Sequence, residues 1–288
     1  MNSQGEIKEE KYWQKALKQS DSAVVNKSLI PLKTKVIRTY IEDNYKFELR
    51  ELIQSNNLTL PQKNRNNTNP FLPWDQNLEI ATISNQHVLI LNKYPVQIGH
   101  MLLITKTWKP QNGWLEIEDF KALTKVDIDT TGLWFFNSGP KAGASQPHRH
   151  LQLLRRGSTD ILCPRMQWYY DFIDDNLDKN DKLLKYINVV SRKKNSRYIA
   201  QDLYNSYTSM CLKLGIGSHA YDIKPRKEYN ILISEDWIAI ILRERDEYKG
   251  FNINALGFAG YLLATYKSDI HWLNTYGPSC LLRSTVGL

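Results

Sequence analysis

Two histidines and a glutamine alternate along one short stretch of the chain, at His148, His150 and Gln152. Side chains two residues apart on a β-strand point to the same face, so the two imidazoles and the amide should project together. A neutral imidazole can attack phosphorus and form a covalent N–P intermediate, and an amide N–H can hold phosphate oxygens as charge builds. Because His150 lies between the other two, we expect it to be the nucleophile.

A loop of small residues, Ser138–Pro147, leads directly into this stretch. Its two glycines allow main-chain amides to approach an anion closely. Lys141 adds a positive charge, and Ser145 adds a hydroxyl donor three residues before His148. These residue types favour phosphoryl transfer, in which catalysis beyond the nucleophile is mostly positioning and charge neutralisation.

The His-x-His spacing is also typical of metal ligands. A metal site needs further ligands, and no Cys, Asp or Glu lies between Thr130 and Arg156. More distant residues could complete such a site, so metal binding stays an alternative. We predict no metal ligands and no tightly bound cofactor, with Mg²⁺ entering, if at all, on the substrate phosphates.

The apolar runs Leu133–Phe136 and Leu151–Leu154 predict one strand on each side of the loop. Further strands are predicted at Leu78–Ile83, Val88–Leu91, Met101–Thr105, Tyr229–Ile233 and Trp237–Leu242. Helices are predicted at 6–19, Phe47–Ile53, Leu115–Asp127, Arg165–Asp175, Tyr198–Leu214 and Leu256–Thr265. Short strands joined by short loops, without regular βαβ alternation, predict an α+β fold with a mostly antiparallel sheet.

The composition bounds the class of protein. With 288 residues and 42% hydrophobic residues, the chain can form one large domain or two small ones with a real core. An excess of 38 Lys and Arg over 30 Asp and Glu favours anionic partners, or serves solubility alone. The dense basic run Arg192–Lys194 is expected to be a solvated loop. Three separated cysteines argue against a disulfide framework and a cysteine zinc cage.

No part of the chain approaches the roughly 20 apolar residues of a membrane span. The first residues are polar and mixed in charge, without an apolar signal core, so we expect a cytoplasmic protein with no membrane partner. A non-catalytic nucleotide- or RNA-binding protein is an alternative. It should interleave basic and aromatic residues on one sheet, and no such block is found, so we predict no nucleic-acid partner.

The segment Asn137–Gln152 resembles the catalytic segment of the diadenosine tetraphosphate phosphorylases, also called ATP adenylyltransferases, of the histidine-triad superfamily. Its H-x-H-x-Q pattern is similar to the branch that includes galactose-1-phosphate uridylyltransferase. Four further blocks follow the family pattern in the same order: Asn69–Asp75, Leu91–Thr105, Tyr229–Trp237 and Asn252–Gly260. The resemblance implies a single histidine-triad-like nucleotidyltransferase domain over residues 1–288, built as a half-barrel of mostly antiparallel strands flanked by helices. Its core would span about 69–265, preceded by accessory helices and an irregular segment over 1–68.

The resemblance also implies a reaction, in which diadenosine tetraphosphate and phosphate give ATP and ADP through an adenylyl group on His150. In this interpretation the main-chain carbonyl of His148 orients the His150 ring, and Gln152 and Ser145 hold phosphate oxygens. The remaining substrate contacts carried over from the family are Asn92, Lys93, Lys63, Asn137, Gly143, Ala144, Gln146, Asn254, Ala255 and Leu256. Thr265 stands where fungal members carry a further lysine, so that contact is not carried over.

Several of these positions have structural alternatives. Asn92 and Lys93 could form a turn, Ser145 could cap loop amides, and Lys63 and Asn254 could be solvated.

Two rival reactions would use the same nucleophile. A hexose-1-phosphate uridylyltransferase would share the fold, but its bacterial members often carry a zinc site with cysteines and follow the nucleophile with glycine, where this chain has Leu151. An ADP sulfurylase-type reaction would let sulfate or phosphate attack the same adenylyl-enzyme. The expected partners are dinucleoside polyphosphates, ATP, ADP and inorganic phosphate, whereas the oligomeric state cannot be read from the sequence.

Overall fold

The computed structural model describes residues 9–53, 69–155, 161–192 and 199–288. The described strands form one large open sheet in the order β3-β4-β5-β7-β6-β9-β10-β8, and each neighbouring pair is antiparallel. These strands are β3 (Glu79–Thr82), β4 (His87–Leu91), β5 (Met101–Thr105), β6 (Leu133–Asn137), β7 (His150–Leu154), β8 (Ile187–Ser191), β9 (Glu228–Ile233) and β10 (Trp237–Arg243). The predicted α+β class with a mostly antiparallel sheet is confirmed.

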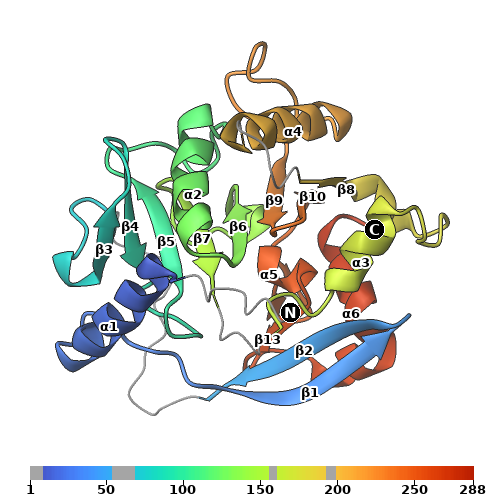
Figure 1. Ribbon diagram of the computed structural model, residues 1–288. Coiled ribbons are helices and arrows are strands. Elements are labelled where there is room, and N and C mark those ends of the chain that lie inside the picture. The colour runs from blue at the N-terminus through green and yellow to red at the C-terminus, as the bar shows by residue number, and fades with distance from the viewer. Residues whose placement is uncertain (1–8, 54–68, 156–160, 193–198) are drawn as a thin grey trace, which may run out of the picture.

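Helices cover both faces of this sheet. In Figure 1, α2 and α4 lie towards the top, and the β1–β2 ribbon crosses the bottom. The helices are α1 (Lys11–Val25), α2 (Ile117–Asp129), α3 (Met166–Ile173), α4 (Ile199–Lys213), α5 (Ala255–Phe258) and α6 (Ile270–Thr285), with 3-10 turns η1 (Gln76–Leu78), η2 (Pro140–Ala142) and η3 (Lys182–Tyr186). Buried residues of α1, α2 and α4 join one core, and those of α3, α5 and α6 join the other. Along β6, Trp134 and Phe136 belong to the first core, and Leu133 and Phe135 belong to the second.

A smaller sheet, ordered β1-β2-β13, contributes to the second core. Its strands are β1 (Thr34–Glu42), β2 (Tyr45–Leu52) and β13 (Tyr261–Ala264), and a separate pair is formed by β11 (Glu247–Tyr248) and β12 (Phe251–Asn252). The helix predicted over Phe47–Ile53 is wrong, because this segment lies in β2 and buries Phe47 and Leu49 at a two-residue spacing. Asp43 and Asn44 have φ values of 49° and 70°, which suit the tight hairpin turn between β1 and β2.

The helix predicted over Leu256–Thr265 is also wrong. Helix α5 ends at Phe258, and the chain then pairs in parallel with β2 as strand β13. Between them Gly260 has a φ of 102°, and a Cβ there would lie 2.8 Å from the carbonyl oxygen of Lys46. Close packing of this turn on β2 therefore requires glycine and ends the helix.

The helix predicted over 6–19 begins later than expected, at Lys11, and continues to Val25. Residues 6–8 lie outside the described part of the chain. The other predicted helices and strands are confirmed to within a few residues.

The two halves of the chain share the large sheet. Strands β3 to β7 come from the first half, and β8, β9 and β10 complete the sheet from the second half (Figure 1). This arrangement favours the single-domain organisation, which stays a prediction. Within the described ranges, no helix is both long and apolar enough to cross a membrane.

Candidate active site

The histidine motif lies in the middle of the large sheet. Strand β7 pairs on one side with β5, where Ile104 faces His150, and on the other side with β6, where Phe135 faces Gln152. The loop between β6 and β7 contains the η2 turn and closes with Gly143 at a φ of 84°. The predicted arrangement of strand, tight loop and strand is confirmed.

His150 is held as a neutral imidazole with a defined tautomer. Its Nδ1 lies 2.8 Å from the carbonyl oxygen of His148, which can only accept, so Nδ1 carries the hydrogen. Nε2 therefore carries the lone pair, and within the described residues it forms no hydrogen bond. Burial lowers the pKa of His150 to about 4, against a weaker opposing effect of the hydrogen bond to His148. This geometry suits a nucleophile.

The His148 ring is fully engaged by the protein. Its Nε2 donates to the carbonyl oxygen of Thr105 at 2.8 Å, and its Nδ1 accepts from Nδ2 of Asn69 at 2.8 Å. Asn69 is itself oriented, because its Oδ1 accepts the main-chain N–H of Phe71. His148 thus contributes its main-chain carbonyl to the site, where it accepts from His150 Nδ1. Its ring stabilises the beginning of β7 by bonding Thr105 and Asn69. The Phe71 ring packs against both imidazoles, at centroid distances of 5.6 and 5.3 Å.

His100 is not among the predicted site residues, yet its ring lies beside Gln152 and His150. Its Nδ1 lies 3.1 Å from Nδ2 of Asn92, which donates, so Nε2 carries the hydrogen. Nε2 is buried without a well-aligned partner among the described residues, and Gln152 is the polar side chain next to it. Burial lowers the pKa of His100 to about 4. His100 is thus a neutral donor aimed into the site.

Three predicted substrate contacts, Asn92, Lys93 and Lys63, are not tied to the histidine motif as closely as the residues above. The Asn92 side chain is used locally, since its Oδ1 accepts the main-chain N–H of Tyr94, as in the turn alternative. Lys93 is exposed, and its ammonium lies 5.9 Å from the centre of the Tyr94 ring. Lys63 lies outside the described residues.

The loop before the histidines has two classes of main-chain amide. Those of Ala142, Gly143 and Ala144 are bonded to carbonyl oxygens of the same loop. The amides of Ser145 and Gln146 have no partner in the described ranges, and neither does the Ser145 hydroxyl, which is exposed. The Gln146 Oε1 is also buried and unpaired there. The donors available to an anion are therefore those nearest the histidines.

The predicted second stretch packs directly on this loop. A Cβ at Gly143 would lie 2.7 Å from the Asn254 Cβ, and the Ala255 main-chain N–H donates to Asn137 Oδ1 at 3.0 Å. Asn254 Oδ1 accepts the main-chain N–H of Leu256 and so caps α5. The fold thus brings together predicted residues that are more than one hundred positions apart.

Gln111 was not predicted and ties the two central strands together. Its Oε1 accepts the His150 main-chain N–H at 2.8 Å, and its Nε2 donates to the carbonyls of Asn137, at 2.7 Å, and His150, at 3.2 Å. The Gln111 side chain is almost fully buried. No local pattern marks it, because the segment around it is an irregular loop.

A buried charge cluster supports the motif from the opposite face of β7. Asp119 bonds both Nε2 of His87, at 2.9 Å, and Nη1 of Arg149, at 3.1 Å. Burial would raise the pKa of Asp119, but the His87 hydrogen bond and the Arg149 charge outweigh it and lower this pKa. His87 therefore has a structural role, as a partner of the buried Asp119.

Two family models together match most of the chain. Residues 2–160 match a family model described as the Ap4A phosphorylase N-terminal domain, and residues 168–287 match one described as the ATP adenylyltransferase C-terminal domain. The chain belongs to the Ap4A phosphorylase family.

Two curated relatives come from Saccharomyces cerevisiae (strain ATCC 204508 / S288c). Diadenosine 5',5'''-P1,P4-tetraphosphate phosphorylase 2 is 27% identical over 233 residues, covering 70% of this chain and 72% of the relative. Protein APA1 is 27% identical over 194 residues, covering 61% of this chain and 60% of the relative.

The fold is shared with solved structures of yeast Ap4A phosphorylase Apa2. The complex with AMP gives a TM-score of 0.72 at 22% identity, covering 96% of this chain and 95% of the other. The complex with Ap4A gives 0.71 at 22% identity, covering 97% of each. The histidine-triad-like fold class expected for this Ap4A phosphorylase family member is confirmed.

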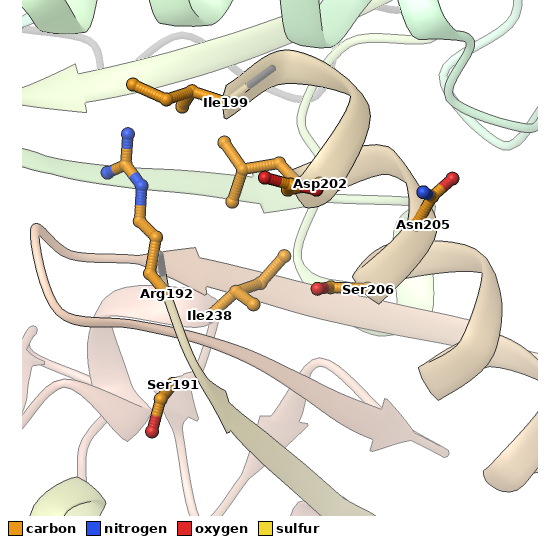
Figure 2. A pocket seen from close by; sticks show the side chains of 8 residues that line it. Ser191, Arg192, Ile199, Asp202, Asn205, Ser206 and Ile238 are labelled. Carbon is orange, nitrogen blue, oxygen red and sulfur yellow. The ribbon is translucent and has the colours of Figure 1, made fainter. Parts of the chain in front are cut away.

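Other clusters of the chain do not join the site. Among the described residues, no group of three or more His, Cys, Asp and Glu side chains is arranged to hold a metal ion. A pocket of about 200 Å³ lies between β8, α4 and β10, and it is lined by none of the candidate site residues. Figure 2 shows the side chains that line it. Arg192 lines this pocket and is not the solvated residue that was expected, because its guanidinium bonds Asp127 and the Ser234 carbonyl. Lys193 and Lys194 lie outside the described residues.

Proposed function

We infer that this chain catalyses the phosphorolysis of diadenosine 5′,5‴-tetraphosphate by inorganic phosphate to ATP and ADP. The observation that carries this inference is the buried, neutral imidazole of His150, whose Nδ1–H is held by the His148 carbonyl, next to a loop with free amides. Family membership supports the substrate class, and the name of the relative in yeast supports the phosphorolytic reaction.

The reaction then runs in two displacements at one phosphorus. His150 Nε2 attacks the α-phosphorus, an N–P bond forms, and the bond to the bridging oxygen breaks, so that ATP leaves. A phosphate oxygen next attacks the adenylyl group, the N–P bond breaks, and ADP forms with His150 restored. The His148 carbonyl stabilises the positive charge that the ring carries in the intermediate.

Donors around the loop would hold the non-bridging oxygens in both transition states. We propose the Ser145 hydroxyl, the Ser145 and Gln146 amides and the side-chain amide of Gln152 for this role, since each lies beside His150 or is unpaired within the described residues. Asn137, Gly143, Ala144 and the Asn254–Leu256 stretch would line the same pocket. Preorganised donors of this kind gain strength in a buried site.

The partners we propose are the dinucleoside polyphosphate, ATP, ADP and inorganic phosphate. Yeast Apa2 has been solved with AMP and with Ap4A, which supports a nucleotide ligand for this fold. We propose no tightly bound cofactor, with Mg²⁺ entering on the substrate phosphates, and a cytoplasmic location.

The decisive experiment is product analysis by chromatography, with and without inorganic phosphate. With phosphate, wild-type protein should give equal amounts of ATP and ADP. Without phosphate, α-labelled substrate should leave acid-labile label on the protein, and His150→Ala should remove this label while retaining nucleotide binding.

Other products would overturn the proposal. Two molecules of ADP would indicate a symmetric hydrolase, transfer to hexose 1-phosphate would indicate a uridylyltransferase, and a requirement for sulfate would indicate the sulfurylase reaction. Full turnover by His150→Ala would exclude His150 as the nucleophile.

A further inference from the structure

A buried arginine, Arg243, is the last residue of β10. It is linked through Asn230 to the loop Ser138–Pro147, which is called the phosphate loop from here on. Its side chain is 1% exposed, and its guanidinium packs over the Phe258 ring at 5.3 Å. Nη2 donates to the carbonyl oxygens of Arg245 and Ile253, at 2.7 and 2.8 Å. Nη1 donates to Oδ1 of Asn230 at 2.6 Å. Arginine has five N–H donors and no acceptor, so the direction of each of these bonds is fixed.

This direction determines how the Asn230 amide is turned. Asn230 is fully buried, and Arg243 requires an oxygen opposite Nη1, so Asn230 must present Oδ1 to it. Nδ2 of Asn230 then faces the other way, where it donates to Oδ1 of Asn137 at 2.8 Å and to the carbonyl oxygen of Ala142 at 2.7 Å. Both Asn230 hydrogens are used, and one of them anchors the phosphate loop.

The orientation of the Asn137 amide, at the end of β6, is fixed by its partners in the same way. Its Oδ1 accepts from Asn230 Nδ2 and also from the Ala255 main-chain N–H. With the oxygen occupied by two donors, the Asn137 NH₂ group is the end left over, and it has no partner among the described residues. Asn137 is the last residue of β6 and leads into the loop that precedes His148 and His150, so its side chain lies at the edge of the proposed anion site.

We infer that Arg243 is a positioning residue that acts through Asn230 to turn the Asn137 amide, so that Asn137 offers N–H donors, and not its oxygen, to the substrate phosphates. This inference rests on the proposed function. A reversed Asn137 amide would set a carbonyl oxygen against a phosphate oxygen and replace an attraction by a repulsion. The chain of three side chains crosses from β10 through β9 to β6, which are neighbours in the sheet although Asn137 and Asn230 are 93 residues apart in the sequence.

The test is the substitution Asn230→Asp. It preserves the shape of the side chain and replaces the Nδ2 donor by an oxygen that can only accept. The carboxylate can still accept from Arg243 and forms an ion pair with it, which supports the fold. It cannot donate to Asn137 or to Ala142, so the Asn137 oxygen faces another oxygen. We expect kcat/KM to fall by about 10- to 150-fold, the range expected for one hydrogen bond to a charged group. The thermal midpoint should remain close to that of the control variant.

A matched control is Asn188→Asp on β8, which also places a carboxylate at a buried asparagine of the same sheet. Asn188 lies on β8, two strands beyond β9, where it pairs with Ile240 of β10, so the kcat/KM of this variant should stay within about twofold of wild type. A loss equal to that of Asn230→Asp would overturn the inference, because a generic effect of buried charge would then explain both.

A double-mutant cycle separates positioning from loss of structure. In the Asn137→Ala background, Asn230→Asp should reduce kcat/KM by no more than about twofold, because the group that Asn230 orients is gone. Additive losses, or a wild-type rate for Asn230→Asp alone, would overturn the inference.

A thio effect gives a second readout. Sulfur in place of a non-bridging oxygen of the reacting phosphate weakens the hydrogen bond that Asn137 donates. For the two diastereomers of this phosphorothioate substrate, the ratio of kcat/KM values should therefore be larger for wild type than for Asn230→Asp. Equal ratios would overturn the inference.

A measurement on wild type covers the case in which Asn230→Asp fails to fold. The Asn137 side-chain NH₂ signals of nitrogen-labelled protein, assigned by their absence in Asn137→Ala, should move downfield on addition of AMP. Unmoved signals, at AMP concentrations that saturate other site resonances, would overturn the inference. If wild type forms no adenylyl-histidine, the proposed function fails instead, so the two failures are distinguishable.

Discussion

His150 can attack phosphorus only while Nε2 is unprotonated, because the lone pair on this nitrogen forms the new bond. Burial lowers the pKa of His150 from 6.5 to about 4. We therefore predict that the rate of adenylylation stays nearly constant as the pH falls from about 8 to about 5.5, and declines only at lower pH.

The size of the effect follows from the fraction of neutral imidazole. At about pH 5, a group with a pKa near 4 is roughly 90% neutral, whereas one with a pKa of 6.5 is roughly 3% neutral. The buried imidazole should thus retain about 30 times more activity at this pH than a solvated one.

The assay is a single turnover with labelled dinucleotide and no inorganic phosphate, quenched at short times. Omitting phosphate isolates the first displacement and removes the titration of the second substrate. Circular dichroism at each pH verifies that the protein is folded.

A matched variant is Phe71→Ala, since the Phe71 ring covers both imidazoles. Admitting water there should move the acid midpoint of the rate upwards towards 6.5. An acid midpoint of the wild-type rate already near 6.5 would refute the reasoning, because the His150 ring would then be solvated and not shielded from water by the fold.

Three further predictions follow from the same contacts. Gln111→Leu removes three hydrogen bonds between β6 and β7, so the free energy of unfolding in urea should fall by about 2–4 kcal/mol, and an unchanged midpoint would contradict this. Ser145→Ala should lower kcat/KM by about 10- to 100-fold without moving the urea midpoint, because its exposed hydroxyl forms no hydrogen bond within the described residues. The buried rings of His100 and His150 have pKa values lowered to about 4, so their contribution to stability is complete above about pH 6.5 and is lost as the pH falls towards about 4. Urea unfolding at about pH 5 should show a loss of about 2 kcal/mol for each ring, and a His100→Gln variant should show a smaller loss.

The secondary structure around the site follows from local patterns. Strands β6 and β7 are apolar runs on either side of a loop of small residues, and their boundaries can be read from composition alone. Prediction failed at Phe47–Ile53, where five of seven residues are good helix formers but pairing with β1 and β13 selects a strand. It failed again after Phe258, where the close approach of Gly260 to β2 ends the helix.

The candidate site divides in the same way. His150, Gln152 and Ser145 are recognisable from spacing and residue type, because a strand and its preceding loop set their positions locally. His100 and Gln111 carry no local signal, since their importance arises from contacts with residues about 25 to 50 positions away.

By itself, the sequence determined the expected nucleophile, the loop beside it and the family resemblance, because these depend on neighbouring residues and on blocks that follow the family order along the chain. Only the tertiary structure decided which nitrogen of His150 carries the lone pair, how low its pKa lies and which way the Asn137 amide is turned. The tautomer of His150 depends on how the chain turns its ring towards the His148 carbonyl, and its pKa depends on burial. The Asn137 amide depends on Asn230 and Ala255, which lie 93 and 118 residues away in the sequence.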